Sequence, residues 1–305
     1  MNGILIIDKP EEYTSFDVVA VLRRLLHVRR IGHTGTLDPM ATGVLPVLIG
    51  PACRANELLP IQDKEYIAGF SLGKKSDTED IWGTVETVSD APVSAAALET
   101  AAAEFRGEIS QVPPMVSSVK KDGKRLYELA RQGLMVERSA RPVTVYRLEI
   151  LEYLPSERSG VLSVHCSKGT YVRSLIHEIG ERLGVGGVLT SLRRTMASGF
   201  ALSQAITLDE ARKRAAEDTL NDSILPVEAG FETLSAVTVS ENQACRFSNG
   251  GALFLDRVPC GEVRRDVSQR VRVHAPSGLF LGLGEIRPDQ NELAIVRLLG
   301  GGIES

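Results

Sequence analysis

The sequence has no pair of closely spaced cysteines. Its four cysteines, Cys53, Cys166, Cys245 and Cys260, lie far apart and form no Cys-x-x-Cys pair. This spacing argues against a zinc site and against a disulfide framework. The five histidines are also scattered, without a His-Glu-x-x-His motif. The sequence therefore predicts neither a metal nor a cofactor.

Long apolar runs are also missing. No stretch approaches the roughly 20 apolar residues that a helix needs to span a bilayer. The first residues, MNGILIIDKPEEYTS, are too few and too acidic for a signal peptide and are typical of a strand and a turn. We therefore expect a cytoplasmic protein with no membrane contact. Its 305 residues, 43% apolar and 24% charged, are typical of an ordinary globular chain of about two domains.

The chain lacks a net positive charge, since 35 basic and 39 acidic residues give −4. The basic residues are nevertheless clustered, and a polyanion responds to the local field rather than to the total charge. Spacing alone is equally compatible with an ordinary solvated surface. The clusters are Arg23-Arg24 with Arg29-Arg30, Lys74-Lys75, Lys120-Lys121 with Lys124-Arg125, Arg193-Arg194, and Arg264-Arg265.

The pattern of apolar residues predicts an α+β domain to about residue 225, followed by a β-rich module of roughly 70 residues. We expect strands at 3–7, 44–49, 64–72, 142–154 and 161–167, and helices beginning near Phe16 (capped by Ser15), at Ala95 and after Gly169. Thr207 and Glu210 predict a capping box for another helix. Residues 111–133 form a long basic excursion, and loops of this size tend to be functional.

One stretch, GHTGTLDPMATGVLP at 32–46, places a single carboxylate in turn chemistry. Pro39 disfavours a helical backbone at Asp38, while Gly35 and Gly43 permit sharp turns around it. A carboxylate on a rigid loop can serve as a nucleophile or a base. Asp-Pro pairs also mark plain turns, so this stretch alone leaves both interpretations open.

A second stretch, SKGTYVRSL at 167–175, has the pattern of a strand end, a turn and a helix start. Tyr171 and Arg173 flank the apolar Val172, so both side chains are able to face a cleft. Arg173 is able to bind a carboxylate in bidentate fashion and keep it ionised. A surface arginine beside a half-buried tyrosine is the alternative, and Tyr66 in the strand at 64–72 is equally typical of packing.

These motifs together resemble the bacterial tRNA pseudouridine-55 synthases, the TruB family. The similarity runs nearly end to end and in the family's order. Its motifs are GILIIDKP (3–10), GHTGTLDPMATGVLP (32–46), KEYIA (64–68), SDTED (76–80), KKDGKRLYELARQG (120–133), RPVTVY (141–146), HCSKGTYVRSL (165–175) and LRRT (192–195).

The resemblance implies roles for individual residues. The family's nucleophilic aspartate falls on Asp38, and its arginine partner falls on Arg173. Tyr66 would stack on the target base, and Tyr171 would lie against the reacting nucleotide as the base of the reaction. His33 would lie near the vacated stack of the RNA. Leu192 would pack on the flipped uracil.

The resemblance also implies the fold and the partner. We expect a pseudouridine synthase domain (1–228) with a mixed, mainly antiparallel sheet and flanking helices, and a small β-barrel-like, PUA-like RNA-binding domain (229–305). Residues 111–133 would form the family's RNA-gripping thumb loop, where Val116 stands in place of a frequent aromatic. Six residues would contact the RNA backbone: Lys120, Lys121, Lys124, Arg125, Arg193 and Arg194. The partner would be the T-arm of tRNA, bound by a monomer without an obligate protein partner.

Three other interpretations remain to be weighed. A tRNA-folding chaperone would not need the catalytic set, which is present here. An RNA-guided synthase of the archaeal–eukaryotic kind would carry an N-terminal extension, whereas this chain enters its first strand at Gly3. A phosphate-binding glycine loop would need the GxxxxGK[ST] pattern, which GHTGTLDP lacks.

Overall fold

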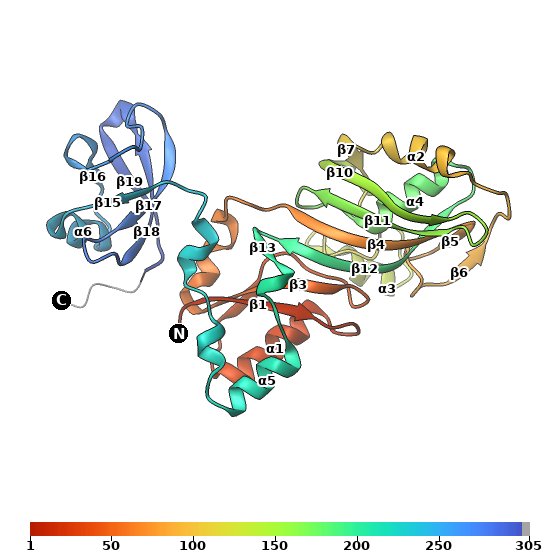
Figure 1. The fold of residues 1–305 in the computed structure, drawn as a ribbon, viewed down its shortest axis with the longest axis horizontal. Helices are drawn as coiled ribbons and strands as arrows, with labels where there is room; N and C mark the ends of the chain where they lie inside the picture. The colour runs from red at the N-terminus through yellow and green to blue at the C-terminus, as the bar shows by residue number, and fades with distance from the viewer. Residues whose placement is uncertain (301–305) are drawn as a thin grey trace.

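The computed structural model describes residues 1–300 and shows a long mixed sheet followed by a smaller, separate sheet (Figure 1). The long sheet has the order β14-β1-β3-β12-β4-β11-β10-β7, with β2 paired to β3 and β13 paired to β12. Only the β1–β14 and β12–β3 pairs are parallel. Its strands are β1 (Gly3–Lys9), β2 (Ile31–His33), β3 (Thr42–Ile49), β4 (Lys64–Leu72), β7 (Gly107–Gln111), β10 (Arg141–Leu154), β11 (Ser159–Cys166), β12 (Gly187–Ala197), β13 (Phe200–Ala201) and β14 (Ile206–Thr207).

Helices cover the long sheet in two groups at opposite ends (Figure 1). One group packs beside β1 and β3, and the other packs beside β4, β10 and β11. The helices are α1 (Ser15–Leu26) and α5 (Leu208–Ala216) in the first group, and α2 (Ala95–Ala103) and α4 (Val172–Arg182) in the second. In addition, α3 (Leu126–Arg131) lies in residues 111–133, the thumb segment, and α6 (Glu241–Ser248) lies beside the small sheet. None of the helices within residues 1–300 is long and apolar enough to cross a membrane.

The small sheet is curled and has the order β15-β17-β18-β19-β16. Its strands are β15 (Ala236–Thr238), β16 (Leu253–Phe254), β17 (Gln269–His274), β18 (Phe280–Arg287) and β19 (Glu292–Leu298). Two short hairpins, β5–β6 (Lys74–Ser76, Val85–Thr87) and β8–β9 (Lys120–Lys121, Lys124–Arg125), lie outside both sheets. This architecture confirms the predicted fold class. The last five residues of the predicted domain 229–305 lie outside the described part of the chain.

The alternation of side chains along β1 explains how the two sheets are joined. Leu5 and Ile7 face the core shared with α1 and α5, whereas Ile4 and Ile6 face the opposite core. That second core also contains Phe231, which is fully buried, and Phe280 from β18. The two aromatic rings stack with centroids 6.5 Å apart. Both faces of β1 are therefore covered, one by α1 and α5 and the other by a core that the segments Gly50–Leu58 and Val227–Phe231 share with β18.

The predicted elements are found, with shifts of a few residues at their ends. The predicted cap of α1 is wrong by one residue, because Thr14 caps the helix and Ser15 already belongs to it. Thr207 does accept from the backbone N–H of Glu210. The Glu210 carboxylate accepts from Arg214 one turn further on, which draws it away from the cap.

Phe231→Ala should lower the free energy of unfolding by about 3–5 kcal/mol, the usual cost of removing a fully buried phenylalanine. Urea unfolding measures this change. Phe254→Ala, at a side chain 58% exposed on the small sheet, is the control and should change stability by less than about 1 kcal/mol. Equal losses in both variants would contradict the assignment of Phe231 to the joint between the sheets.

Candidate active site

The loop between β2 and β3 carries Asp38 and is fixed from below by apolar side chains. Leu37, Met40 and Ala41 are buried on either side of Asp38, and the N–H of Ala41 donates to the Asp38 carbonyl at 3.0 Å. The Asp38 carboxylate itself is not covered by these side chains and stays 36% exposed. The sequence thus builds a closed turn whose single charged side chain is left accessible.

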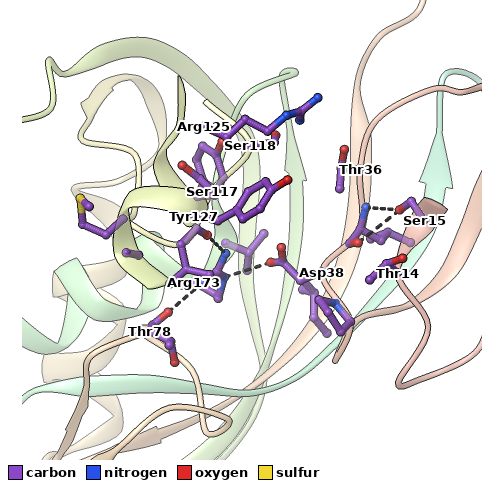
Figure 2. A pocket seen from close by; sticks show the side chains of 18 of the residues that line it. Thr14, Ser15, Thr36, Asp38, Thr78, Ser117, Ser118, Arg125, Tyr127 and Arg173 are labelled. Carbon is purple, nitrogen blue, oxygen red and sulfur yellow. Dashed lines mark hydrogen bonds and ion pairs between the residues drawn. The ribbon is translucent and has the colours of Figure 1, made fainter. Parts of the chain in front are cut away.

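Ser15 ties this loop to the first turn of α1. The backbone N–H of Leu37 donates to the Ser15 hydroxyl at 2.9 Å, and that hydroxyl lies 3.2 Å from the Leu37 carbonyl (Figure 2). Ser15 is 2% exposed, so water does not compete for these hydrogen bonds. The residue directly before Asp38 is therefore fixed to a helix terminus.

Lys9 holds the other side of the loop, although sequence reasoning saw it only as the end of a strand. Its ammonium donates to the carbonyls of Pro10, Tyr13 and Pro39 at 2.8, 2.5 and 3.3 Å, and the side chain is fully buried. Burial lowers the pKa of Lys9 to about 8, and the negative charge of Asp38 partly opposes this shift.

Arg194 binds backbone carbonyls at both ends of the loop. Its guanidinium donates to the carbonyls of Val44 at 2.7 Å and Gly35 at 3.1 Å. Gly43 has a φ of +102°, and a Cβ there would lie 2.1 Å from the Arg194 carbonyl oxygen. Glycine is thus needed at position 43 because two backbones meet there.

The prediction that Arg194 contacts RNA backbone is therefore wrong. Its side chain is fully buried, whereas the neighbouring Arg193 is partly exposed and pairs with Asp8 at 2.7 Å. Consecutive residues of a strand point to opposite faces, so only one arginine of the Arg193-Arg194 pair is able to reach solvent. The Arg193-Arg194 pair alone does not indicate which of the two reaches solvent.

Arg173 reaches the Asp38 loop from α4. Its Nε lies 3.0 Å from Asp38 Oδ2 (Figure 2). Its Nη1 lies 3.4 Å from Asp80 Oδ2. The guanidinium also donates to the carbonyls of Thr78 and Val116, both at 2.8 Å. With a side chain only 3% exposed, Arg173 is a buried cation whose donors are shared among four acceptors. Asp80 was part of a quoted motif, but its partnership with Arg173 was not predicted.

Tyr171 precedes α4 and is fixed through its backbone. Gln111, at the start of the thumb segment, accepts from the Tyr171 N–H at 2.8 Å and donates to the Tyr171 carbonyl at 3.1 Å. Burial raises the pKa of the Tyr171 phenol, and the nearby Ser117 hydroxyl partly opposes this change. The tyrosine therefore holds its proton at neutral pH.

One cavity of about 1000 Å³ lies above these residues. Asp38 and Arg173 meet inside it, between walls from α1, β4, the thumb segment and the start of α4. Seven predicted site residues line this cavity: His33, Asp38, Tyr66, Tyr171, Arg173, Leu192 and, at its rim, Arg125. Residues far apart in the sequence are thereby brought to one place.

The environment of the cavity explains the state of its ionisable groups. Burial raises the pKa of Tyr66 to about 12, and Tyr66 lies beside the buried Arg194. Burial and then the charge of Arg194 lower the pKa of both His33 and Lys64, the latter to about 8. The cavity wall therefore combines neutral aromatic rings with cations held close to the Asp38 carboxylate.

The remaining predicted RNA contacts lie outside the centre of the cavity. Arg125 is exposed and lines its rim. Lys120 and Lys124 are exposed on the β8–β9 hairpin, and Lys121 donates to the Glu137 carbonyl at 2.6 Å. Among residues 1–300 no group of three or more histidine, cysteine, aspartate or glutamate side chains is placed to hold a metal ion.

Family models match most of the chain. Residues 23–172 match the model described as TruB family pseudouridylate synthase (N terminal domain), and residues 173–232 match the tRNA pseudouridylate synthase B C-terminal domain. The fold is thus that of a pseudouridine synthase. The chain belongs to the TruB family.

Curated relatives extend the match over nearly the whole sequence. The chain is 41% identical over 294 residues to the tRNA pseudouridine synthase B of Pseudomonas putida, covering 95% of this chain and 93% of the relative. It is 39% identical over 299 residues to the protein of the same name from Alkaliphilus oremlandii, covering 98% of each.

Solved structures support the same fold at lower identity. A chain in a Cbf5-Nop10-Gar1 complex matches with a TM-score of 0.71 and 28% identity, and the match covers 99% of this chain and 84% of that one. A chain in an H/ACA RNP bound to a substrate RNA containing 2′-deoxyuridine matches with a TM-score of 0.70, 26% identity and the same coverage. The resemblance predicted from sequence is confirmed.

Lys9→Met should lower the free energy of unfolding by about 1–3 kcal/mol at pH 7, because three carbonyls lose the donor that the buried Lys9 supplies. The folded pKa of Lys9 is about 8, below the 10.5 of a free lysine. Between these values the unfolded chain binds a proton that the folded chain has released. The wild type should therefore gain stability over the variant as the pH rises from 8 to 10.

Urea unfolding of both proteins at pH 7, 8, 9 and 10 measures this difference. Lys213→Met, which removes an exposed lysine on α5, is the control and should show no such trend. A difference between wild type and Lys9→Met that stays flat across the series would contradict the buried, destabilised ammonium.

Proposed function

We propose that this protein isomerises uridine 55 in the TΨC loop of tRNA to pseudouridine, with Asp38 as the nucleophile. The observation that carries the proposal is the ion pair of Asp38 with the buried Arg173, at 3.0 Å, inside a cavity large enough for a flipped nucleotide. The guanidinium fixes the orientation of the carboxylate.

The reaction breaks the N1–C1′ bond, rotates the base and joins C5 to C1′. It changes no oxidation state and adds no external group, so the proposal includes no cofactor. Tyr66, Tyr171 and Leu192 would sandwich the detached uracil through its faces, which retains the ring while leaving it free to turn in its plane. The phenolate form of Tyr171, a small fraction at neutral pH, would then take the proton from C5. His33 would lie near the stack that the base has left.

Access to the uridine requires that the base be flipped out of the folded RNA. This costs roughly a few kcal/mol, which stacking in the pocket and phosphate contacts would offset. Lys120, Lys121, Lys124 and Arg125 of the thumb segment 111–133, together with Arg193, would supply those contacts. Binding would therefore weaken as salt is added.

The proposal extends to the organisation of the chain. Residues 1–228 would form the catalytic domain and residues 229–305 a PUA-like RNA-binding domain. The protein would act as a monomer in the cytoplasm on the T-arm of tRNA, without an obligate protein partner. The names of the curated relatives, tRNA pseudouridine synthase B, support the choice of tRNA. Activity of the isolated protein on a tRNA transcript would separate this from an RNA-guided mode of action.

Asp38→Asn should reduce pseudouridine formation by several orders of magnitude, because the amide keeps the shape of the side chain but lacks its nucleophilic charge. Release of tritium from C5-labelled uridine in tRNA measures turnover, and filter binding measures affinity. Binding should stay within about threefold of wild type. Asp209→Asn, at a side chain 91% exposed on α5, is the control. Wild-type turnover by Asp38→Asn would refute the nucleophile.

Tyr171→Phe should slow single-turnover conversion by about 10²-fold or more while leaving the half-saturating tRNA concentration within a few-fold. The ring remains for stacking, but the proton acceptor is gone. Because the Tyr171 pKa is raised, the phenolate fraction grows with pH throughout the range 7–9. The wild-type rate should rise with pH in this range, and the variant should lose that rise. Identical pH profiles would argue against Tyr171 as the base.

A further inference from the structure

Phe16 is a large apolar side chain left exposed at the wall of the active-site cavity. It lies in the first turn of α1, is 64% exposed and lines the same cavity as Asp38. Its neighbours on the helix, Val18 and Val19, are buried in the core beneath α1. Phe16 belongs to none of the apolar cores of the described chain. Folding therefore gives this ring no packing partner of its own.

A guanidinium covers one side of the ring. The Cζ of Arg23, two helical turns further along α1, lies 5.6 Å from the centroid of Phe16, within cation–π range. Arg23 is itself held in place, because its Nη2 donates to the Ile31 carbonyl at 3.2 Å. The pair is therefore a flat apolar surface backed by a fixed positive charge.

The position of the ring is set by the same contacts that set the Asp38 loop. Thr14 and Asp17 form a capping box that fixes the start of α1. Ser15, between Thr14 and Phe16, is hydrogen-bonded to Leu37, the residue before Asp38. The hydrogen bonds between Ser15 and Leu37 therefore join the residue before Phe16 to the residue before Asp38.

Basic residues continue outward from this side of the cavity. Arg24, Arg29 and Arg30 are exposed at the end of α1 and the start of β2. They belong to the first basic cluster of the sequence, to which the proposed function assigns no part. Alternating aromatic faces and guanidinium groups are typical of surfaces that bind unstacked nucleotides and their phosphates.

The size of the cavity leaves room for this contact. About 1000 Å³ is at the upper end of pockets that enclose whole drug-sized ligands, and a single pyrimidine ring is much smaller. The uracil position between Tyr66, Tyr171 and Leu192 therefore accounts for only part of the space. The wall formed by α1 remains available to a second base.

We infer that Phe16, backed by Arg23, stacks on the nucleobase directly adjacent to the target uridine, with the connecting phosphates directed toward Arg24, Arg29 and Arg30. This second base position rests on the proposed function, since it presumes that a flipped uridine occupies the cavity. It would hold a second base out of the RNA stack during the reaction.

The test pairs Phe16→Ala with T-arm hairpins that lack one base. Three RNAs are needed: an intact hairpin, and hairpins with an abasic ribose on the 5′ or the 3′ side of the target. On intact RNA, Phe16→Ala should raise the half-saturating concentration and the equilibrium dissociation constant about tenfold or more, the effect of losing one base–aromatic stack. The saturating rate should change much less. Phe16→Trp should restore wild-type binding.

On one of the two abasic RNAs the difference between wild type and Phe16→Ala should disappear, and that RNA identifies the stacked neighbour. Phe254→Ala is the matched control, because Phe254 also lies under a guanidinium, with Arg257 Cζ at 5.3 Å, but lines no part of the cavity. Its effect should be the same on all three RNAs.

A Phe16→Ala penalty that persists on both abasic RNAs, or no penalty on intact RNA, would overturn the inference while wild-type conversion left the proposed function standing. Failure of the wild type to convert the intact hairpin would refute the proposed function. The pairing of Phe16 with one base would then still be decided by the dissociation constants of the same three RNAs.

Discussion

The site depends on a buried guanidinium that joins three segments of the chain. Arg173 is almost inaccessible to water, and a buried charge is tolerated only when it is paired and hydrogen-bonded. Its partners come from the Asp38 loop, from the Thr78–Asp80 segment and from the thumb segment at Val116. Losing any of these partners would leave the cation poorly satisfied, so the three segments stabilise one another. The orientation of Asp38 is thus a property of the assembled fold.

Three buried cations surround the Asp38 carboxylate. Lys9 and Arg194 bind backbone carbonyls of the loop, while Arg173 binds its side chain. In a poorly solvated wall, such charges act over short distances with little screening. Although the chain is acidic overall, positive charge is therefore concentrated around Asp38. Arg173 would serve the chemistry at Asp38, whereas Lys9 and Arg194 shape the loop that carries it.

Much of this was predictable from sequence because the signals are local. The Asp-Pro turn between glycines marks the Asp38 loop, and apolar periodicity located the strands and the helix that carries Arg173. The errors arose where a tertiary contact decides. The sequence favours Ser15 as a cap, but Thr14 caps the helix while Ser15 binds Leu37. The predicted RNA contact of Arg194 is wrong because Arg194 points inward. Alternation along a strand implies that one of two adjacent arginines points inward, but not which of them.

The contact between Arg173 and position 116 goes through a backbone carbonyl. Every residue type presents that same acceptor, so the closed arrangement of the thumb segment does not depend on which side chain stands there. Val116, where the family often carries an aromatic ring, keeps the 2.8 Å hydrogen bond to Arg173. Val116 is 36% exposed and lines the cavity. Substitutions at position 116 would therefore change contacts with the substrate without altering how the loop is anchored.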